Sequence, residues 1–200
     1  MPTAAPSAES TARRPTTRNT VLIAVFAGLI AAMGLVPPIS IGFIPVPITL
    51  QTLGVMLAGA MLGPVRGMLS ALIVVLLASS GLPILAGGRG GLGVLVGPTG
   101  GYLVGWIPGA AIVGLLVKYW AIKVRLTALR YVTVAISALV GGVLVIYAVG
   151  VPWTSVVTGL PLAASALGSI AFLPGDVIKA VLTGMVAVTV HRSYRGLLDS

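Results

Sequence analysis

Apolar residues fill six long runs of this chain, and glycine, proline and arginine separate one run from the next. The runs cover residues 19–36, 48–62, 67–80, 99–117, 131–150 and 176–191. A helix needs about 20 mainly apolar residues to cross a bilayer. Because the second and third runs are shorter, we expect both helices to extend into the flanking glycine and proline segments. The pattern predicts an all-α, polytopic integral membrane protein, built as a bundle of six transmembrane helices.

The segments outside these runs have a different composition. Residues 1–18 combine Pro, Ser, Thr and Ala with three arginines, which predicts a disordered cytoplasmic tail. Residues 19–191 form the predicted membrane domain, and residues 192–200 a cytoplasmic C-terminal tail. Within the domain we expect a long glycine-rich outer loop between the third and fourth helices. We also expect a short helix at about residues 160–170, beside the bundle.

Composition narrows the class of protein further. Hydrophobic residues make up 58% of the 200 residues and charged residues 8%, with a mean hydropathy of +1.14, which is too apolar for a soluble domain. The net charge of +9 comes from too few groups to coat a phosphate backbone, so we expect no nucleic-acid partner. The chain has no cysteine and one histidine, which excludes disulfides, thiolate metal sites and multi-histidine zinc sites.

Lysine and arginine indicate the orientation of the bundle, because positively charged loops stay in the cytoplasm. With both termini inside, ten of the 12 cations fall on the cytoplasmic side: Arg13, Arg14, Arg18, Arg66, Lys118, Lys123, Arg125, Arg130, Arg192 and Arg195. The two exceptions are Arg89, in the glycine-rich loop, and Lys179, inside the sixth helix. Topology does not account for these two cations, so they direct the search for a functional site.

Asp176 is the only acidic residue between the two tails, and it stands three residues before Lys179. Pro174 and Gly175 precede it, so we expect Asp176 in the first turn of the sixth helix, with Lys179 on the same face. Charged groups within a bilayer usually face a protein interior or a watery cavity. One interpretation is a ligand site that opens to the outer face. The alternative is a helix cap and a snorkelling lysine that neutralise each other.

The glycine-rich loop segment at residues 81–101 contains nine glycines and a single charge, Arg89. Gly88, Gly90 and Gly93 match a G-x-G-x-x-G spacing, but a dinucleotide site requires an acidic residue about 20 positions on, and none is there. A Walker lysine is also missing. Backbone groups at Gly88, Gly90 and Gly91 can approach a small ligand while Arg89 binds its carboxylate. The alternative is a flexible linker with a solvated arginine.

Small residues recur at four-residue spacing in the first run, where they allow another transmembrane helix to approach closely. These residues are Ala24, Ala27, Gly28, Ala31 and Ala32. Packing inside the bundle and docking of an external membrane partner are equally consistent with the pattern.

Three further side chains are candidates for ligand contact. Gln51, near the outer start of the second run, can hydrogen-bond a ligand or lie at the membrane interface. Tyr102 and Trp153 fall near predicted helix ends, where aromatic belts form, and either ring can stack on a ligand. Catalysis is poorly supported, because one acid and one terminal histidine supply neither a carboxylate pair nor a triad. We therefore expect no enzyme activity, no metal and no cofactor.

Three segments resemble the BioY family, the biotin-specific substrate-binding (S) components of energy-coupling-factor (ECF) vitamin transporters. They are PVPITLQTLGVMLAGAMLGPVRG at 45–67, GLPILAGGRGGLGVLVGPTGGYLVG at 81–105 and LPGDVIKA at 173–180. The resemblance implies a six-helix membrane protein that binds biotin near the outer face. It also implies docking onto a transmembrane coupling protein that bears two ATPases, so that partner subunits hydrolyse the ATP.

The same resemblance implies that Asp176, Lys179, Arg89 and the glycines beside Arg89 contact biotin. Biotin's ureido ring suits the aspartate and lysine pair, and its carboxylate suits arginine, although the reverse orientation also fits. Family members often carry an amide side chain at the end of the third helix, where this sequence ends in Ser79 and Ser80, so the polar contact there stays open. The resemblance favours the first helix as the docking face for the coupling protein.

The sequence thus predicts a biotin-binding transport component, embedded in the lipid of the cell membrane. Two alternatives stay open: an S component for another small carboxylated vitamin, and a structural subunit of a membrane complex that binds no ligand. The sequence also leaves open whether the ATPase module is dedicated or shared, and whether the chain forms a homo-oligomer.

Overall fold

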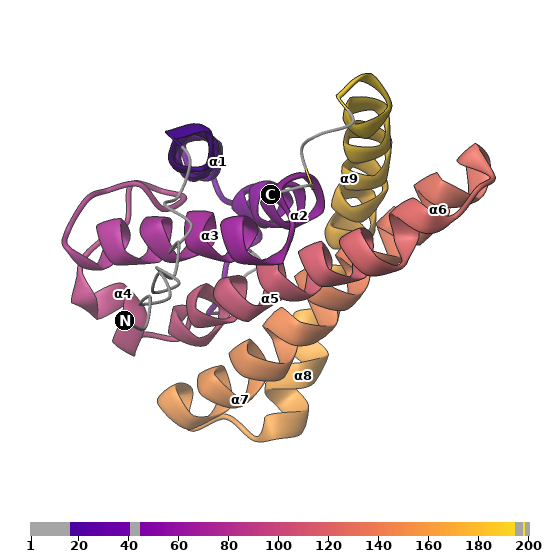
Figure 1. Ribbon diagram of the computed structural model, residues 1–200. Helices are drawn as coiled ribbons and strands as arrows, with labels where there is room; N and C mark the ends of the chain where they lie inside the picture. Colours follow the sequence, from indigo (N-terminus) through magenta and orange to yellow (C-terminus); the bar gives the residue numbers. More distant parts are fainter. Residues whose placement is uncertain (1–16, 41–44, 195–197, 199–200) are drawn as a thin grey trace, which may run out of the picture.

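The computed structural model of the protein describes residues 17–40, 45–194 and 198. Its named elements are all helical (Figure 1), and extended residues in these ranges pair only in two isolated bridges. The elements are α1 (Thr17–Met33), α2 (Gln51–Leu62), α3 (Pro64–Ser79), α4 (Leu92–Val96), α5 (Gly100–Tyr119), the 3-10 turn η1 (Ala121–Lys123), α6 (Thr127–Leu139), the π-helical turn η2 (Val140–Val145), α7 (Ile146–Thr158), α8 (Leu162–Ile170) and α9 (Leu173–Ser193). The predicted all-α class is confirmed.

Within the described ranges, three helical stretches are long and apolar enough to cross a membrane. They are Gly100–Lys123, Thr127–Thr158 and Leu173–Ser193, which coincide with the last three predicted spans. The first three predicted spans correspond to the shorter apolar helices α1, α2 and α3. These apolar helices indicate an integral membrane protein with several helices of membrane-spanning length.

The second helix does not extend as the sequence suggested. α2 begins at Gln51, three residues after the predicted start, and its 12 residues span about 18 Å. Pro45 and Pro47 disfavour helix in the residues just before them, so the chain enters α2 through non-helical backbone. Such backbone is tolerated at membrane depth where protein surrounds it, and ten of the 12 residues of α2 are buried. The third helix does extend, back to Pro64.

α2 lies at the centre of the bundle and packs against α1, α3, α5 and α9. It turns into α3 at Gly63, whose φ of 83° is a left-handed conformation that favours glycine, and Pro64 then starts α3 with its fixed φ. α5 crosses directly over this turn, because a Cβ on Gly114 would lie 2.4 Å from the carbonyl carbon of Gly63. Small residues thus allow α5 to pack closely against this turn.

The fifth helix is longer than the predicted run of residues 131–150. α6, η2 and α7 form one continuous helical stretch, which passes through Pro152. A proline removes one backbone hydrogen bond, yet the helix continues through it, and α7 packs against α5 and α8. The expected short helix is confirmed as α8, which lies beside α7 (Figure 1).

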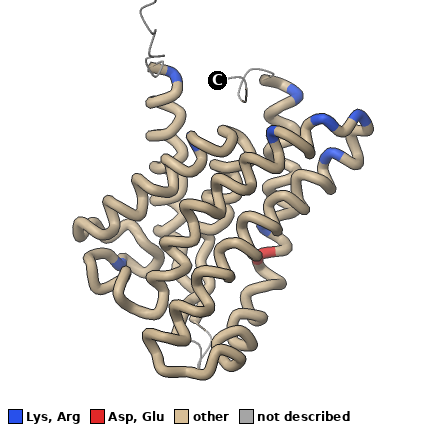
Figure 2. Tube along the Cα trace, turned by 60° about the horizontal axis from the view of Figure 1, so that its bottom comes forward, with Lys and Arg blue, Asp and Glu red and all other residues tan. Residues whose placement is uncertain are grey.

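The predicted domain boundaries differ slightly from the helix ends. α1 begins at Thr17, two residues before the expected boundary, and α9 continues to Ser193. Residues 1–16 of the predicted N-terminal tail, which was expected to cover 1–18, lie outside the described residues, whereas Thr17 and Arg18 belong to α1. Figure 2 shows that most lysines and arginines gather at the end of the molecule where α1 begins and α9 ends. This distribution agrees with the sorting of charge that the sequence suggested.

Candidate ligand-binding site

Asp176 and Lys179 form a buried ion pair in the first turns of α9. The Nζ atom of Lys179 lies 2.8 Å from Oδ1 of Asp176, and the two residues are 7% and 3% exposed. The predicted common face is confirmed. Burying two charges is costly unless each finds further hydrogen bonds, so the remaining contacts decide whether this pair is stable.

The protein supplies those hydrogen bonds from the segment before α2 and from helices α2 and α7. Lys179 Nζ also donates to the carbonyl oxygen of Thr49 at 2.7 Å and to Oγ1 of Thr52 at 2.8 Å, which together with Asp176 uses its three protons. The hydroxyl of Tyr147 donates to Oδ2 of Asp176 at 2.6 Å. We call these five residues the polar network. It ties α9 to the start of α2 and to α7.

A cavity of about 60 Å³ opens beside the polar network. Its walls come from the segment before α2, the glycine-rich loop and helices α2, α5, α7 and α9. The lining residues are Val46, Pro47, Ile48, Thr49, Gln51, Thr52, Leu85, Arg89, Thr99, Tyr102, Leu103, Trp106, Ile146, Tyr147, Phe172, Asp176 and Lys179. The cavity combines apolar walls with a few converging polar groups, which is the usual character of a small-molecule site.

Three aromatic rings form one wall of this cavity. The ring centroids of Tyr102, Tyr147 and Phe172 lie 5.9 to 6.3 Å apart, and every pair meets edge to face. The hydroxyl of Tyr102 lies 2.7 Å from Oγ of Ser169 on α8, which holds the ring in place. Such a wall offers flat apolar surface to a ring-containing ligand.

Arg89 reaches the cavity from a tight turn in the glycine-rich loop. Leu85 and Arg89 exchange two backbone hydrogen bonds, at 3.1 and 3.2 Å, and Gly87 and Gly88 between them have φ values of 79° and 67°. Nε of Arg89 donates to the carbonyl of Ala86 at 3.0 Å. Burial lowers the pKa of Arg89 below its usual value, but a guanidinium stays protonated in proteins, so this part of the lining is positive.

Gln51 supports the loop from the first residue of α2. Its Nε2 donates to the carbonyls of Ile30 and Ile84, each at 3.1 Å, and its Oε1 accepts from the amide of Ala86 at 3.0 Å. The side chain lines the cavity, but these three bonds occupy its amide group. Gln51 therefore positions the loop that carries Arg89.

Five of the predicted contact residues lie away from the cavity lining, among them Trp153, whose Nε1 donates to the carbonyl of Gly97 at 3.0 Å. Gly88 is exposed in the turn, and Gly91 donates its amide to Ala78 at the end of α3. A Cβ on Gly90 would lie 2.2 Å from the carbonyl oxygen of Leu82, so this glycine allows two segments of the loop to pack closely. Ser80 is exposed and donates to the carbonyl of Leu77. The glycines shape the loop, and no polar group at the end of α3 faces the cavity.

Comparison with known sequences identifies the family. The sequence description of the BioY family matches residues 5–196 of this chain. The chain belongs to the BioY family. It is 48% identical over 178 residues to the biotin transporter BioY of Rhizobium etli, a match that covers 89% of this chain and 95% of the relative. It is 49% identical over 191 residues to the biotin transporter BioY of Rhodobacter capsulatus, with the same coverage.

The fold agrees with that of a solved S-component for biotin. The crystal structure of the S-component for biotin from an ECF-type ABC transporter superposes with a TM-score of 0.82 and 36% sequence identity. The match covers 88% of this chain and 91% of that one. The resemblance noted in the sequence is confirmed, and the arrangement of the helices is that of an ECF S component.

Sequence reasoning missed part of the polar network of this BioY family member. Thr49 and Thr52 flank Gln51 in the first family segment, and that position beside a known candidate was the available signal. Tyr147 had no such signal, because it lies in the middle of an apolar run, 29 residues before Asp176. Only the packing of α7 against α5 and the start of α9 brings its hydroxyl to the carboxylate.

Proposed function

We propose that this protein is the biotin-binding S component of an ECF-type vitamin transporter, and that the cavity beside Asp176 and Lys179 is its biotin site. The polar network carries this proposal, because two buried charges with a complete set of partners border a cavity with aromatic walls. The S-component for biotin that shares this fold supports it.

The chemistry of the lining suggests how biotin lies. The ureido ring offers two N–H donors and one carbonyl acceptor, which fit the carboxylate of Asp176 and the ammonium of Lys179 once biotin's carbonyl replaces one of the three present acceptors of that ammonium. The bicyclic ring system fits against Tyr102 and Phe172. The carboxylate at the far end fits Arg89, whose forked donors bind planar anions well. In this orientation each polar or apolar part of biotin faces a lining side chain of complementary chemistry.

The cavity is small for such a ligand. Its volume of about 60 Å³ is below the range of about 300–1,000 Å³ of typical small-molecule pockets. Binding of biotin therefore requires the lining to open. The wall formed by the glycine-rich loop is the part we propose to move, because it is outside the helical bundle and carries Arg89.

We further propose that α1, α2, α3, α5, the α6–α7 stretch and α9 each cross the cell membrane, with both termini in the cytoplasm. The gathering of lysines and arginines at one end supports this orientation, since positively charged segments stay inside (Figure 2). The cavity then opens toward the outer face, where the transported vitamin arrives. The short α2 fits the same topology, because non-helical backbone completes its crossing within the protein.

The small residues of α1 lie on two faces of the helix, one packed on the bundle and one exposed. Ala27 is buried against the bundle, whereas Ala24, Gly28 and Ala32 are exposed, and a Cβ on Gly28 would meet nothing within 4 Å. We propose that the exposed stripe docks the transmembrane coupling protein, because small residues let two membrane helices approach closely. Partner ATPases then supply the energy, and this chain itself is not an enzyme.

Titration of the purified protein with biotin tests the binding proposal. We expect saturable binding tighter than micromolar that other carboxylated vitamins do not displace at equal concentration. Displacement by another vitamin would assign the cavity to that vitamin. Binding weaker than micromolar for all of them would leave a structural subunit and overturn the proposal.

Replacement of a single residue on α1 tests the docking proposal. Gly28→Leu adds bulk to the exposed stripe, so we expect it to abolish co-purification with the coupling module and biotin uptake while biotin binding is unchanged. Val25→Leu, at an exposed position beside the stripe, is the matched control and keeps assembly. Normal assembly of Gly28→Leu would refute the docking face.

A further inference from the structure

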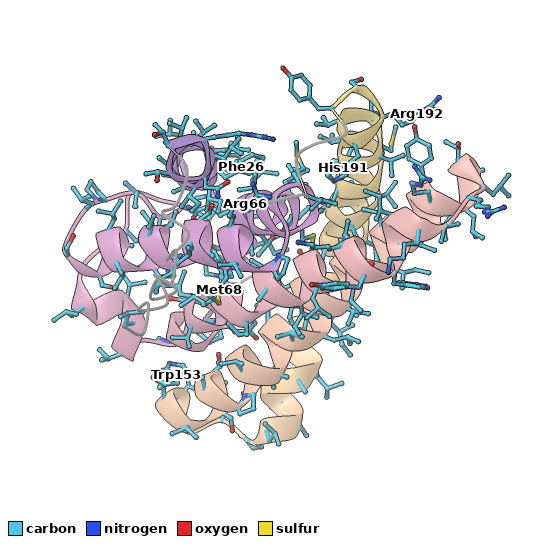
Figure 3. The ribbon with its side chains drawn as sticks, in the orientation of Figure 1. Phe26, Arg66, Met68, Trp153, His191 and Arg192 are labelled. Carbon is cyan, nitrogen blue, oxygen red and sulfur yellow. The ribbon has the colours of Figure 1, made fainter. Side chains whose placement is uncertain are left out.

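A second, larger cavity lies at the opposite end of the molecule from the glycine-rich loop. Its volume is about 770 Å³, and it lies among the ends of α5, η1, α6 and α9. We call it the basic pocket. Its lining residues are Lys118, Tyr119, Ile122, Lys123, Arg130, His191, Arg192 and Leu198. His191 and Arg192, labelled in Figure 3, lie at the end of α9.

The charged side chains that line this pocket are all basic. Four of its eight lining residues are lysine or arginine, and no aspartate or glutamate among the described residues lines it. Arg130 donates to the carbonyl of Val124 from two nitrogens, at 3.1 and 2.8 Å. The Nζ atoms of Lys118 and Lys123 each lie 5.9 Å from the ring centroid of Tyr119, so both lysines make cation–π contacts with this ring. The pocket therefore concentrates positive charge.

The depth of the pocket in the membrane follows from the helix ends. Lys123 is the last residue of the first membrane-spanning stretch, Arg130 lies in the first turn of the second, and Arg192 is next to last in the third. Three span ends thus meet where the phosphate layer of a bilayer lies. Tyr119 and Trp120 are 58% and 45% exposed there, as expected of rings at a membrane interface.

We propose that the basic pocket binds the phosphate headgroup of an anionic phospholipid. Lysine and arginine converge on the space at headgroup depth, and guanidinium groups suit phosphate oxygens. Exposed apolar side chains on the same helices, such as Leu115 and Leu129, offer surface for the acyl chains. Basic pockets between transmembrane helices are a known way to hold such headgroups. This site is separate from the biotin cavity and does not depend on the proposed function.

Lipid binding to the full-length protein in neutral detergent tests the proposal. Native mass spectrometry with added phosphatidylglycerol or phosphatidylcholine gives the affinity of each lipid. We expect tighter binding of phosphatidylglycerol, and about 30-fold weaker binding of it to Lys118→Gln/Lys123→Gln, since each cation near an anionic surface contributes about 1 kcal/mol. Lys118→Arg/Lys123→Arg keeps the charge and should bind as the wild type does.

The control removes the same charge next to the pocket. Arg125 is exposed in the connection between η1 and α6, but it does not line the cavity. Arg125→Gln should change phosphatidylglycerol affinity less than twofold. Equal affinity for the two lipids, or an equal loss in Arg125→Gln and in the double lysine variant, would overturn the proposal.

Two other outcomes would assign the pocket to a different occupant and also overturn the proposal. Inorganic phosphate that binds as tightly as the lipid would indicate a soluble anion site. A double lysine variant that binds the lipid normally but no longer assembles with the coupling module would indicate a protein-docking site.

Discussion

The polar network and the basic pocket show two ways in which this apolar chain uses charge. In the network, Asp176 and Lys179 are almost fully buried, and hydrogen bonds of 2.6 to 2.8 Å join them to the protein. In the basic pocket, Lys118 and Lys123 lie at a span end beside a wide cavity and a tyrosine ring. The depth of each charge in the membrane explains the difference. A charge deep in the bilayer needs partners within the protein, whereas a charge at the membrane interface is stable in contact with water and stays available to a ligand.

The largest effect is expected from removal of one charge of the network. Asp176→Asn leaves Lys179 buried beside a neutral amide, and breaking a buried pair in this way costs about 3 to 5 kcal/mol. We expect a lower unfolding midpoint in detergent and biotin binding more than about 100-fold weaker. Thermal unfolding and biotin titration of the same preparation measure both.

A double variant separates binding from folding in that experiment. Asp176→Asn/Lys179→Met removes both charges, so it should recover much of the unfolding midpoint because no unpaired charge stays buried. Biotin binding should stay lost. A double variant that binds biotin normally would show that the pair is only structural, as one sequence interpretation holds.

A smaller effect is expected at the other end of the cavity. Arg89→Ala removes the proposed partner of biotin's carboxylate, and hydrogen bonds to charged groups contribute about 1.5 to 3 kcal/mol, or about 10- to 150-fold in affinity. Titration with biotin amide, which lacks the negative charge, should show a much smaller difference between wild type and variant. The same loss for both ligands would place the carboxylate elsewhere.

The hydroxyl groups of the two cavity tyrosines should differ in effect. Tyr147→Phe removes the donor to Asp176, and we expect about 10-fold weaker biotin binding. Tyr102→Phe breaks only the contact with Ser169, so it should have about half that effect in free energy. Unchanged biotin affinity in Tyr147→Phe would mean that binding gains nothing from this hydroxyl.

The smallest effect on biotin is expected from the basic pocket. Lys118→Gln/Lys123→Gln should leave biotin affinity within about twofold of wild type, because the two sites share no lining residue and distant sites act independently. Biotin titration of the variant in detergent is the measurement. A large loss would show that the two ends of the bundle are coupled.

Hydrophobic runs predicted the all-α class and the location of the helices, because lipid-exposed backbone must satisfy its hydrogen bonds within a helix. These runs failed to predict the helix ends where packing against neighbouring helices outweighs the local effect of a proline. Pro45 and Pro47 keep the chain before α2 non-helical, yet Pro152 lies inside α7, which is packed on α5. Both predictions were wrong at a proline: the second helix does not extend into its proline segment, and the fifth continues through Pro152.

The sequence also predicted only part of the candidate site. The scarcity of charge directed attention to Asp176, Lys179 and Arg89, and all three line one cavity. Sequence could not show that the amide of Gln51 is occupied by the loop, nor that Gly88, Gly90 and Gly91 shape the turn and do not line the cavity. These roles depend on which distant backbone groups lie within hydrogen-bond distance.

The sequence alone determined the membrane class, the family and the residues whose charge topology does not explain, since each is a property of composition or of local spacing. Tertiary structure decided which groups complete the environment of those charges. Lys179 is held by Thr49 and Thr52, about 130 positions earlier, and Asp176 by Tyr147 of another helix. Such partners are selected by how helices pack, and a buried charge is stable only after that packing has brought its partners to it.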